Sequence, residues 1–286
     1  MKYLYYPGCS LEGTAKEYDH STRALFKVLG AQLIEIPGWT CCGASAAEAE
    51  SELLSIVLPA RNLALAESMD ESATDILVPC SACYLNLKRA AEETRKDPGL
   101  LAKVNEVLAT EGLVLKGRKQ VRHLLDVLAS DIGPQKISGH IHTGMDQFCV
   151  APYYGCQCLR PYAVFDDPEL PTSMEPLIRA TGASLHDWHM AAKCCGASLM
   201  NIQPEIGREM VAAILAGAVG TDAIVTVCPM CQMNLEGYQN QVSRSAHQDL
   251  HQAIIYLPQF LGLALGLAPA ELSLDLNLSK PLAFRP

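Results

Sequence analysis

The chain lacks the features that mark secreted and membrane proteins. The most apolar segment, 253–268, is interrupted by Pro258, so no run of about 18 or more apolar residues could form a membrane-spanning helix. The first residues do not combine a charged segment, an apolar run and a small-residue cleavage site, so we expect no secretory signal. These two absences predict a cytoplasmic protein without a membrane span.

Clusters of basic residues are also missing. The 286 residues include 22 Lys and Arg against 31 Asp and Glu, which gives a formal net charge of −9. The basic residues are scattered along the chain, whereas binding to nucleic acid requires a concentrated basic surface. We therefore expect no nucleic-acid partner.

Cysteine, in contrast, is abundant, with 12 residues in the chain. Thiols stay reduced in the cytoplasm, so cysteine clusters there are more often metal-binding or catalytic than a framework of disulfides. The length suggests two compact domains. A hydrophobic content of 49% is enough to build a core in each of them.

Ten of the cysteines form three blocks that occur twice in the same order. Each half has a lone cysteine after glycine, an adjacent pair before glycine, and a Cys-x-x-Cys block. The blocks begin at Cys9, Cys41 and Cys80 in the first half and at Cys156, Cys194 and Cys228 in the second. Corresponding blocks are 147, 153 and 148 positions apart. Chance does not preserve such a register, so we infer a duplication with domains at 1–140 and 141–286.

The segments between the cysteine blocks alternate between short apolar strands and helical patterns. This alternation predicts an α/β fold with two homologous domains, each with a small parallel sheet and flanking helices, related by a pseudo-two-fold axis. Because the cysteine blocks follow strands, they should gather at the carboxyl edge of each sheet. Strands are expected at 3–6, 33–36, 76–78, 148–153, 183–186 and 223–227. Helices are expected at 17–29, 46–69, 81–96, 173–180, 205–218 and from 230 on, and 97–140 should join the halves with a helical face at 123–128.

The adjacent cysteine pair distinguishes between kinds of metal site. A Cys-x-x-Cys block at the start of a helix suits zinc, an iron–sulfur cluster or a redox dithiol. Neighbouring side chains in extended backbone point apart, so both thiols of a pair cannot easily reach one tetrahedral ion. A polynuclear cluster offers several iron atoms, and Gly43 and Gly196 allow the backbone to bend after each pair. The pattern therefore favours iron–sulfur.

Two cysteines and several histidines stand outside the repeat. Cys149 lies in an apolar strand-like run and is expected to be a small core residue. Cys158 follows Cys156 by two residues and could reach a cluster edge, but the first half has Leu11 in its place, so we interpret it as a bystander. Possible proton donors, each more often structural than catalytic, are His20, His140, His142, His186 and His189.

The repeated pattern resembles the cysteine-rich CCG domain. Two tandem copies, with Arg160-Pro161-Tyr162-Ala163 and Phe165-Asp166-Asp167-Pro168 in the second, resemble the HdrB component of heterodisulfide reductase over residues 1 to about 266. The resemblance implies two non-cubane [4Fe-4S] clusters, one per half. The implied ligands are Cys9, Cys41, Cys42, Cys80 and Cys83 for the first cluster, and Cys156, Cys194, Cys195, Cys228 and Cys231 for the second.

The resemblance also implies an activity and partners. The partners would be a ferredoxin-type subunit like HdrC and a flavoprotein like HdrA, and the substrate a small disulfide or thiol. The absence of a Gly-rich dinucleotide motif fits a flavin held by another chain. Cleaving a disulfide takes two electrons whereas one cluster typically passes one, so a disulfide held between two clusters would resolve the mismatch.

Two other classes of function remain open at this stage. The first is a CCG-domain subunit that transfers electrons or anchors a complex without substrate chemistry, like those of the succinate dehydrogenase and glycolate oxidase complexes. The second is a scaffold stabilised by zinc. An open cleft between the two groups of cysteines would favour the catalytic subunit, and a sealed interface would favour electron transfer.

Overall fold

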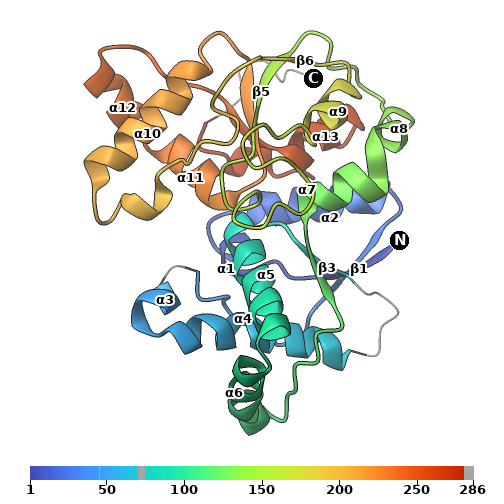
Figure 1. Ribbon diagram of the computed structural model, residues 1–286. Coiled ribbons are helices and arrows are strands. Elements are labelled where there is room, and N and C mark those ends of the chain that lie inside the picture. The colour runs from blue at the N-terminus through green and yellow to red at the C-terminus, as the bar shows by residue number, and fades with distance from the viewer. Residues whose placement is uncertain (45, 70–74, 280–286) are drawn as a thin grey trace.

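Two parallel four-stranded sheets organise the computed structural model, which describes residues 1–44, 46–69 and 75–279 (Figure 1). The strand orders are β2-β1-β3-β4 and β6-β5-β7-β8, so the second half repeats the topology of the first. This repetition confirms the predicted α/β duplication. The strands are β1 (Lys2–Tyr5), β2 (Gln32–Glu35), β3 (Asp75–Val78), β4 (Gln120–His123), β5 (Cys149–Tyr153), β6 (Ser184–Leu185), β7 (Ala223–Thr226) and β8 (Ile254–Tyr256).

Helices connect the strands and cover the sheets. In the first half they are α1 (Cys9–Glu12), α2 (Lys16–Val28), α3 (Ala46–Glu50), α4 (Glu52–Ser68), α5 (Ser81–Lys96), α6 (Pro98–Leu108), α7 (Leu124–Val127) and α8 (Gly133–Ser138). In the second they are α9 (Glu175–Arg179), α10 (Pro204–Gly217), α11 (Pro229–Gly237), α12 (Gln239–Ala246) and α13 (Leu257–Ala264). None of these described helices is long and apolar enough to cross a membrane.

Three details of the predicted elements were wrong. The helix expected over 46–69 is two helices, because Ser51 begins a new one by accepting a hydrogen bond from the Leu54 N–H at 3.3 Å. The joining segment 97–140 has the expected helical face as α7, which begins directly after His123, but it also contains β4, which was not expected. Strand β8 was not expected either. Three of the four residues of β4 are polar and only Val121 is apolar, so the sequence does not show the apolar alternation of a typical strand. The domain boundary at 140/141 stays a prediction.

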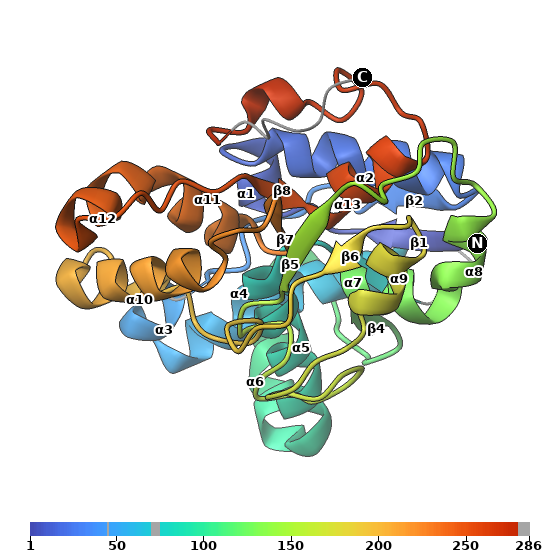
Figure 2. The same cartoon turned by 90° about the horizontal axis from the view of Figure 1, so that it is seen from above.

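The two halves meet along matching elements. Helix α2 of the first half packs against α13 of the second, and Figure 2 shows them side by side. Tyr18 of α2 stacks on Tyr256 at the end of β8, with ring centroids 4.1 Å apart. The equivalent strand of the first half, β4, ends at His123, which stacks in parallel on Phe165 of the second half at 6.1 Å. The junction is thus built from one aromatic stack on each side of the pseudo-two-fold axis.

Glu17, also on α2, is a buried carboxyl at this junction. Burial raises its pKa from 4.5 to about 7, and the charge of Glu236 on α11 contributes to the rise. Well below pH 4.5 the carboxyl is protonated in both the folded and the unfolded chain, so it does not affect stability. Between about pH 4.5 and 7 the unfolded chain loses this proton more readily than the folded chain does, so stability falls as pH rises.

We therefore expect Glu17→Gln to raise the free energy of unfolding by about 2–3 kcal/mol at pH 8 and by much less at pH 5. Denaturant unfolding of the variant and the unchanged protein at both pH values measures the difference. A gain of the same size at both pH values would contradict a role for the ionised carboxylate.

Candidate metal centres

Strand ends bring the cysteine blocks of each half to one edge of its sheet. Strand β3 ends at Val78 and β7 at Thr226, and each is followed within two residues by the first cysteine of the Cys-x-x-Cys block. These two cysteines, Cys80 and Cys228, stand directly before α5 and α11. The lone cysteines, Cys9 and Cys156, follow the ends of β1 and β5 by four and three residues. Since these strands run parallel within each sheet, all of these blocks project from the same edge.

In the first half, the five thiols lie in one continuous group. The Sγ atoms of Cys9 and Cys41 are 3.7 Å apart, and those of Cys42 and Cys83 are 3.3 Å apart. Hydrogen bonds also link Cys41 to Cys42 and Cys80 to Cys83. Cys9 and Cys41 are exposed and the other three thiols are buried, so the group is open to solvent on one side.

The second half repeats these pairings. Cys156 is hydrogen-bonded to Cys194, and Cys231 is hydrogen-bonded to both Cys195 and Cys228. All five thiols line one small pocket of about 50 Å³. Ser81 lines the same pocket, although it belongs to the Cys-x-x-Cys block of the first half. The structure thus brings together all five predicted cysteines of each half, and their role as ligands stays a prediction.

Buried tyrosines fix the backbone that leads into each cysteine pair. The Tyr6 hydroxyl donates to the carbonyl of Thr40, the residue before Cys41, at 2.7 Å. The Tyr153 hydroxyl donates to the carbonyl of Lys193, the residue before Cys194, also at 2.7 Å. The two tyrosines occupy equivalent places, three residues before each lone cysteine. The duplication therefore preserves the support of the site as well as the thiols.

Asparagines fix the backbone that leaves each pair. Asn86 donates to the Ala44 carbonyl at 3.1 Å, and Asn234 donates to the Cys195 carbonyl at 2.6 Å. Both follow the last cysteine of their half by three residues. Each asparagine therefore ties the helix after Cys-x-x-Cys to the loop of the adjacent pair, and so holds two cysteine blocks in register.

Replacing Asn234 with alanine should lower the free energy of unfolding by about 1–3 kcal/mol, because the buried Cys195 carbonyl would lose its partner. Thermal or denaturant unfolding measures the loss. Asn201→Ala is the matched control, since Asn201 is exposed, and it should change stability by less than about 0.5 kcal/mol. Equal losses in the two variants would contradict the proposed support.

Glycines let the lone-cysteine turns approach the Cys-x-x-Cys thiols. Gly8 and Gly155 both have positive φ, at 74° and 71°. A Cβ atom at Gly8 would lie 2.8 Å from the Sγ of Cys83, and one at Gly155 would lie 2.9 Å from the Sγ of Cys231. Only glycine leaves room for the sulfur at these positions.

Hydrogen bonds between neighbouring thiols favour the thiolate form of one partner in each half. Hydrogen bonds from Cys41 and then Cys83 lower the pKa of Cys42 to about 3. A hydrogen bond from Cys156 lowers the pKa of Cys194 to about 6. The same hydrogen bonds raise the pKa of their partners Cys41 and Cys156. The thiolate rather than the thiol is the metal ligand, so metal binding must release protons from these partners.

The donor set fits a polynuclear cluster better than one ion. Within residues 1–44, 46–69 and 75–279, no three histidine, cysteine or acidic side chains are arranged to hold a single metal ion. Five thiolates exceed the four ligands of a tetrahedral zinc. In an iron–sulfur cluster the thiolates bind different iron atoms, so they do not have to converge on one point. The residues present therefore fit an iron–sulfur cluster in each half.

The two remaining cysteines are placed differently. Cys149 is partly buried on β5, and its backbone N–H donates to Asp222 at 2.7 Å. Cys158 is buried, its thiol donates to the Tyr154 carbonyl at 3.3 Å, and burial raises its pKa. Cys158 is therefore a protonated thiol, which agrees with the interpretation that it is a bystander.

The predicted histidines make structural contacts, while a different histidine lies near the cysteines. Three of them form hydrogen bonds: His20 with Ser273, His140 with the Lys136 carbonyl, and His186 with the Gly217 carbonyl. His142 packs against Gly266, and His189 lines a separate pocket of the second half. The histidine near the cysteines is His123, which is fully buried with its Nε2 atom 3.1 Å from the Ser81 hydroxyl. Sequence reasoning missed it because β4 was not recognised.

Comparisons with known proteins agree with the geometry. A family model described as a cysteine-rich domain (CCG) matches residues 3–88 and again 150–236. The 8-methylmenaquinol:fumarate reductase membrane anchor subunit of Wolinella succinogenes is 35% identical over 280 residues, which cover 96% of each chain. The HdrB component of the ferredoxin/F(420)H(2)-dependent CoB-CoM heterodisulfide reductase of Methanosarcina acetivorans is 30% identical over 99% of this chain and 95% of its own.

A solved structure gives the same fold at low sequence identity. A hypothetical protein from Helicobacter pylori aligns with 98% of this chain at a TM-score of 0.77 and 17% identity, and the present chain spans 52% of its length. The two family matches contain all ten repeated cysteines. This chain therefore belongs to the family of tandem cysteine-rich CCG-domain proteins that includes HdrB of heterodisulfide reductase.

Proposed function

We propose that this chain is the catalytic subunit of a heterodisulfide reductase-like complex. It binds two non-cubane [4Fe-4S] clusters through the ten repeated cysteines, five in each half. Electrons reach it through a ferredoxin-type subunit like HdrC and a flavoprotein like HdrA, and it reduces or forms a disulfide of small thiols. The family relationship and the equivalent thiol contacts of the two halves support this proposal.

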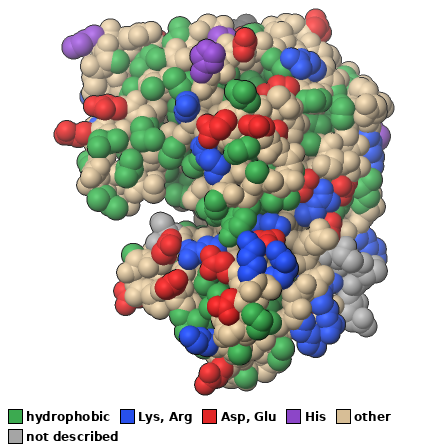
Figure 3. Space-filling model, in the orientation of Figure 1, with side chains coloured by type: hydrophobic (Ala, Val, Ile, Leu, Met, Phe, Trp, Pro, Cys, Tyr) green, Lys and Arg blue, Asp and Glu red, His purple; other side chains and the backbone are tan. Residues whose placement is uncertain are grey.

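The observation that carries the proposal is an open cleft between the halves. A pocket of about 370 Å³ has Ala44, Ala82 and Arg89 of the first half on one side and Gln157 and Tyr162 of the second half on the other. The molecular surface is hollowed at this junction (Figure 3). Such a volume is in the range of small-molecule sites. A cleft of this kind favours substrate chemistry over a sealed electron-transfer interface.

The walls of this cleft adjoin ligands of both sites. Ala82 precedes Cys83, and Gln157 follows Cys156. Gln157 also lines the small pocket among the five thiols of the second half, so the cleft and that pocket share a wall. The described residues that line the cleft include none of the ten cysteines, so a disulfide in it would reach the thiols past Ala82 and Gln157.

The overall reaction adds two electrons and two protons to R–S–S–R′, breaks the S–S bond and releases RSH and R′SH. Each cluster, when bound, supplies one of the two electrons. The chain itself holds the ten thiolates, keeps the Cys-x-x-Cys thiols away from solvent, and orients the disulfide in the cleft. Cys83 and Cys231 are buried, so this side of each site is shielded from solvent. The lone cysteines, Cys9 and Cys156, are more exposed.

A single-turnover experiment tests this function. Protein with both clusters reduced should be oxidised by one equivalent of a small aromatic or aliphatic disulfide, with release of two thiols per chain. Absorbance and electron paramagnetic resonance (EPR) follow the clusters, and a thiol assay follows the product. If the reduced clusters persist in excess disulfide, the chain is not the site of disulfide chemistry.

The second candidate function is a subunit that transfers electrons or anchors a complex without substrate chemistry. It is favoured by the 35% identity to a protein named as a membrane anchor subunit. In this case the clusters would be present and reducible, but small disulfides would not oxidise them. The same single-turnover experiment therefore separates the two candidates.

A further inference from the structure

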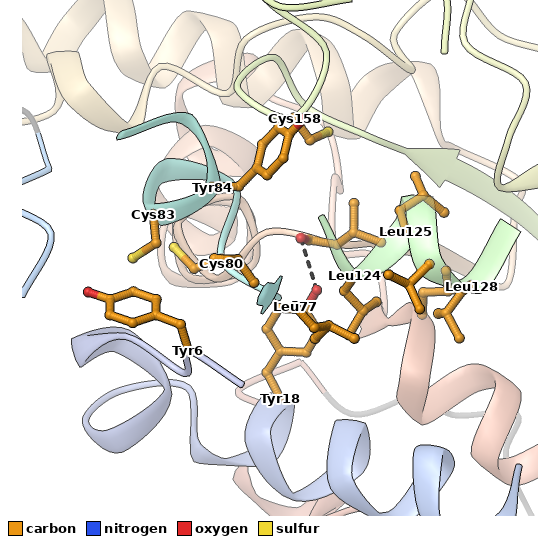
Figure 4. Close-up of a cluster of buried hydrophobic side chains, with 14 of the residues drawn as sticks. Tyr6, Tyr18, Leu77, Cys80, Cys83, Tyr84, Leu124, Leu125, Leu128 and Cys158 are labelled. Atoms are coloured by element: carbon orange, nitrogen blue, oxygen red, sulfur yellow. Dashed lines mark hydrogen bonds between the residues drawn. The ribbon is translucent and has the colours of Figure 1, made fainter. Parts of the chain in front are cut away.

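The two Cys-x-x-Cys loops are tied together by one tyrosine hydroxyl. Tyr18 lies 3.1 Å from the Pro79 carbonyl and 3.0 Å from the Val227 carbonyl, and Figure 4 shows its ring directed from α2 toward the loop of Cys80. Pro79 and Val227 directly precede Cys80 and Cys228. The first cysteines of the two blocks therefore lie close to each other across the junction.

Beside this contact, one half contributes a polar side chain to the site of the other. Ser81 is almost completely buried and lines the pocket formed by the five thiols of the second half. In the second half, Pro229 occupies the corresponding place after Cys228 and has no hydroxyl to offer in return. The pseudo-two-fold symmetry is thus broken at this point.

His123 determines which way the Ser81 hydroxyl points. The Leu125 N–H donates to the Nδ1 atom of His123 at 3.2 Å. Burial lowers the pKa of His123 to about 4, so the ring is neutral and its single proton is on Nε2. The Pro79 carbonyl also faces the ring and can accept this proton. A protonated Nε2 cannot accept a hydrogen bond from the Ser81 hydroxyl, whose oxygen lies 3.1 Å away, so the serine must direct its own hydrogen to another acceptor.

Three acceptors lie within reach of that hydrogen. The Val227 carbonyl is 3.4 Å away and already accepts from Tyr18 at the shorter distance. The Cys158 thiol, to which Ser81 is also hydrogen-bonded, donates its own hydrogen to the Tyr154 carbonyl at 3.3 Å, so its sulfur is an uncharged acceptor. The third acceptor is Cys228, with which Ser81 also forms a hydrogen bond. A metal-bound thiolate carries negative charge, which makes Cys228 the strongest of the three acceptors.

We propose that Ser81, oriented by His123, donates a hydrogen bond across the junction to Cys228 and thereby raises the reduction potential of the second cluster alone. Hydrogen bonds to ligand sulfurs stabilise the more negatively charged reduced form of a cluster. This inference rests on the proposed cluster binding. It makes the two clusters inequivalent, with Ser81 and His123 as positioning residues rather than catalytic ones.

An EPR-monitored redox titration of the full-length protein tests the proposal. Ser81→Ala should lower the midpoint potential of one cluster and leave the other unchanged. The expected change is about tenfold in the ratio of reduced to oxidised cluster at a fixed potential, which equals about 59 mV for one electron. The affected midpoint should be the one that remains in Cys42→Ala protein, in which the first site has lost a ligand.

Two further variants complete the test. His123→Leu should shift the same midpoint in the same direction, because the serine loses the ring that orients it. Ser198→Ala, an exposed serine on the wall of the same pocket, should leave both midpoints unchanged. If iron and turnover are retained and neither Ser81→Ala nor His123→Leu moves a midpoint, this inference is wrong and the proposed function stands. If the purified protein contains no iron, the proposed function itself fails.

Discussion

Replacing Cys195 with serine should remove one cluster and abolish disulfide turnover. Cys195 is buried, and its thiol is hydrogen-bonded to Cys231, so its loss removes a central ligand of the second site. Iron content should fall from about eight to about four atoms per chain. Turnover should fall by at least about 100-fold, because only one cluster would remain for a two-electron reaction. Mutations that disturb a metal site only indirectly cost up to about 100-fold, so the loss of a direct ligand should cost at least as much.

Cys149→Ser is the matched control for this experiment. Cys149 is partly buried on β5 and is not one of the ten repeated cysteines. Its replacement should leave iron content and turnover within about twofold of the unchanged protein, since no ligand is lost. Normal turnover by Cys195→Ser protein with half the iron would rule out joint action of the two sites.

Gly8→Ala should selectively empty the first site. The new Cβ atom would lie 2.8 Å from the Sγ of Cys83, and that sulfur would have to move from its place among the thiols. The glycine also has φ of 74° and ψ of 163°, a conformation essentially restricted to glycine, so an L-residue there is strained by about 1–3 kcal/mol. We expect about half of the iron to be lost, with the four atoms of the second site retained.

Gly30→Ala separates the two effects of this substitution. Gly30 has nearly the same φ, 68°, but a Cβ atom there would meet nothing within 4 Å. The control should therefore share the positive φ while retaining all of the iron. Gly155→Ala, whose Cβ atom would lie 2.9 Å from the Sγ of Cys231, should empty the second site instead. Equal iron loss from Gly8→Ala and Gly30→Ala would contradict the steric argument.

The duplicated fold could be predicted because its signal is local. The sequence alone shows cysteine blocks at fixed spacing and short β-branched runs such as the one in β7, so no knowledge of the packing is needed to recognise them. Strands β4 and β8 were missed for the opposite reason. β4 carries polar residues such as Arg122, which pairs with Asp75 on β3, a residue that only the fold brings near, and β8 has three residues.

The polar groups of the junction could not be predicted from one sequence. Ser81 belongs to the Cys-x-x-Cys block of the first half, and nothing local indicates that its side chain lines the pocket of the second. The same holds for Tyr18, whose carbonyl partner Val227 is 209 positions away. Such contacts depend on how the two halves pack. The cysteine spacing therefore identified the thiols, but not the residues that surround them at the junction.

The most direct test of the account is the content of iron, acid-labile sulfide and zinc in anaerobically purified protein. Two four-iron clusters predict about eight irons and eight sulfides per chain, with no zinc. About four irons would mean that only one half holds a cluster, which contradicts a disulfide site between two clusters. Zinc in place of iron would contradict the redox function altogether and leave a zinc-stabilised scaffold.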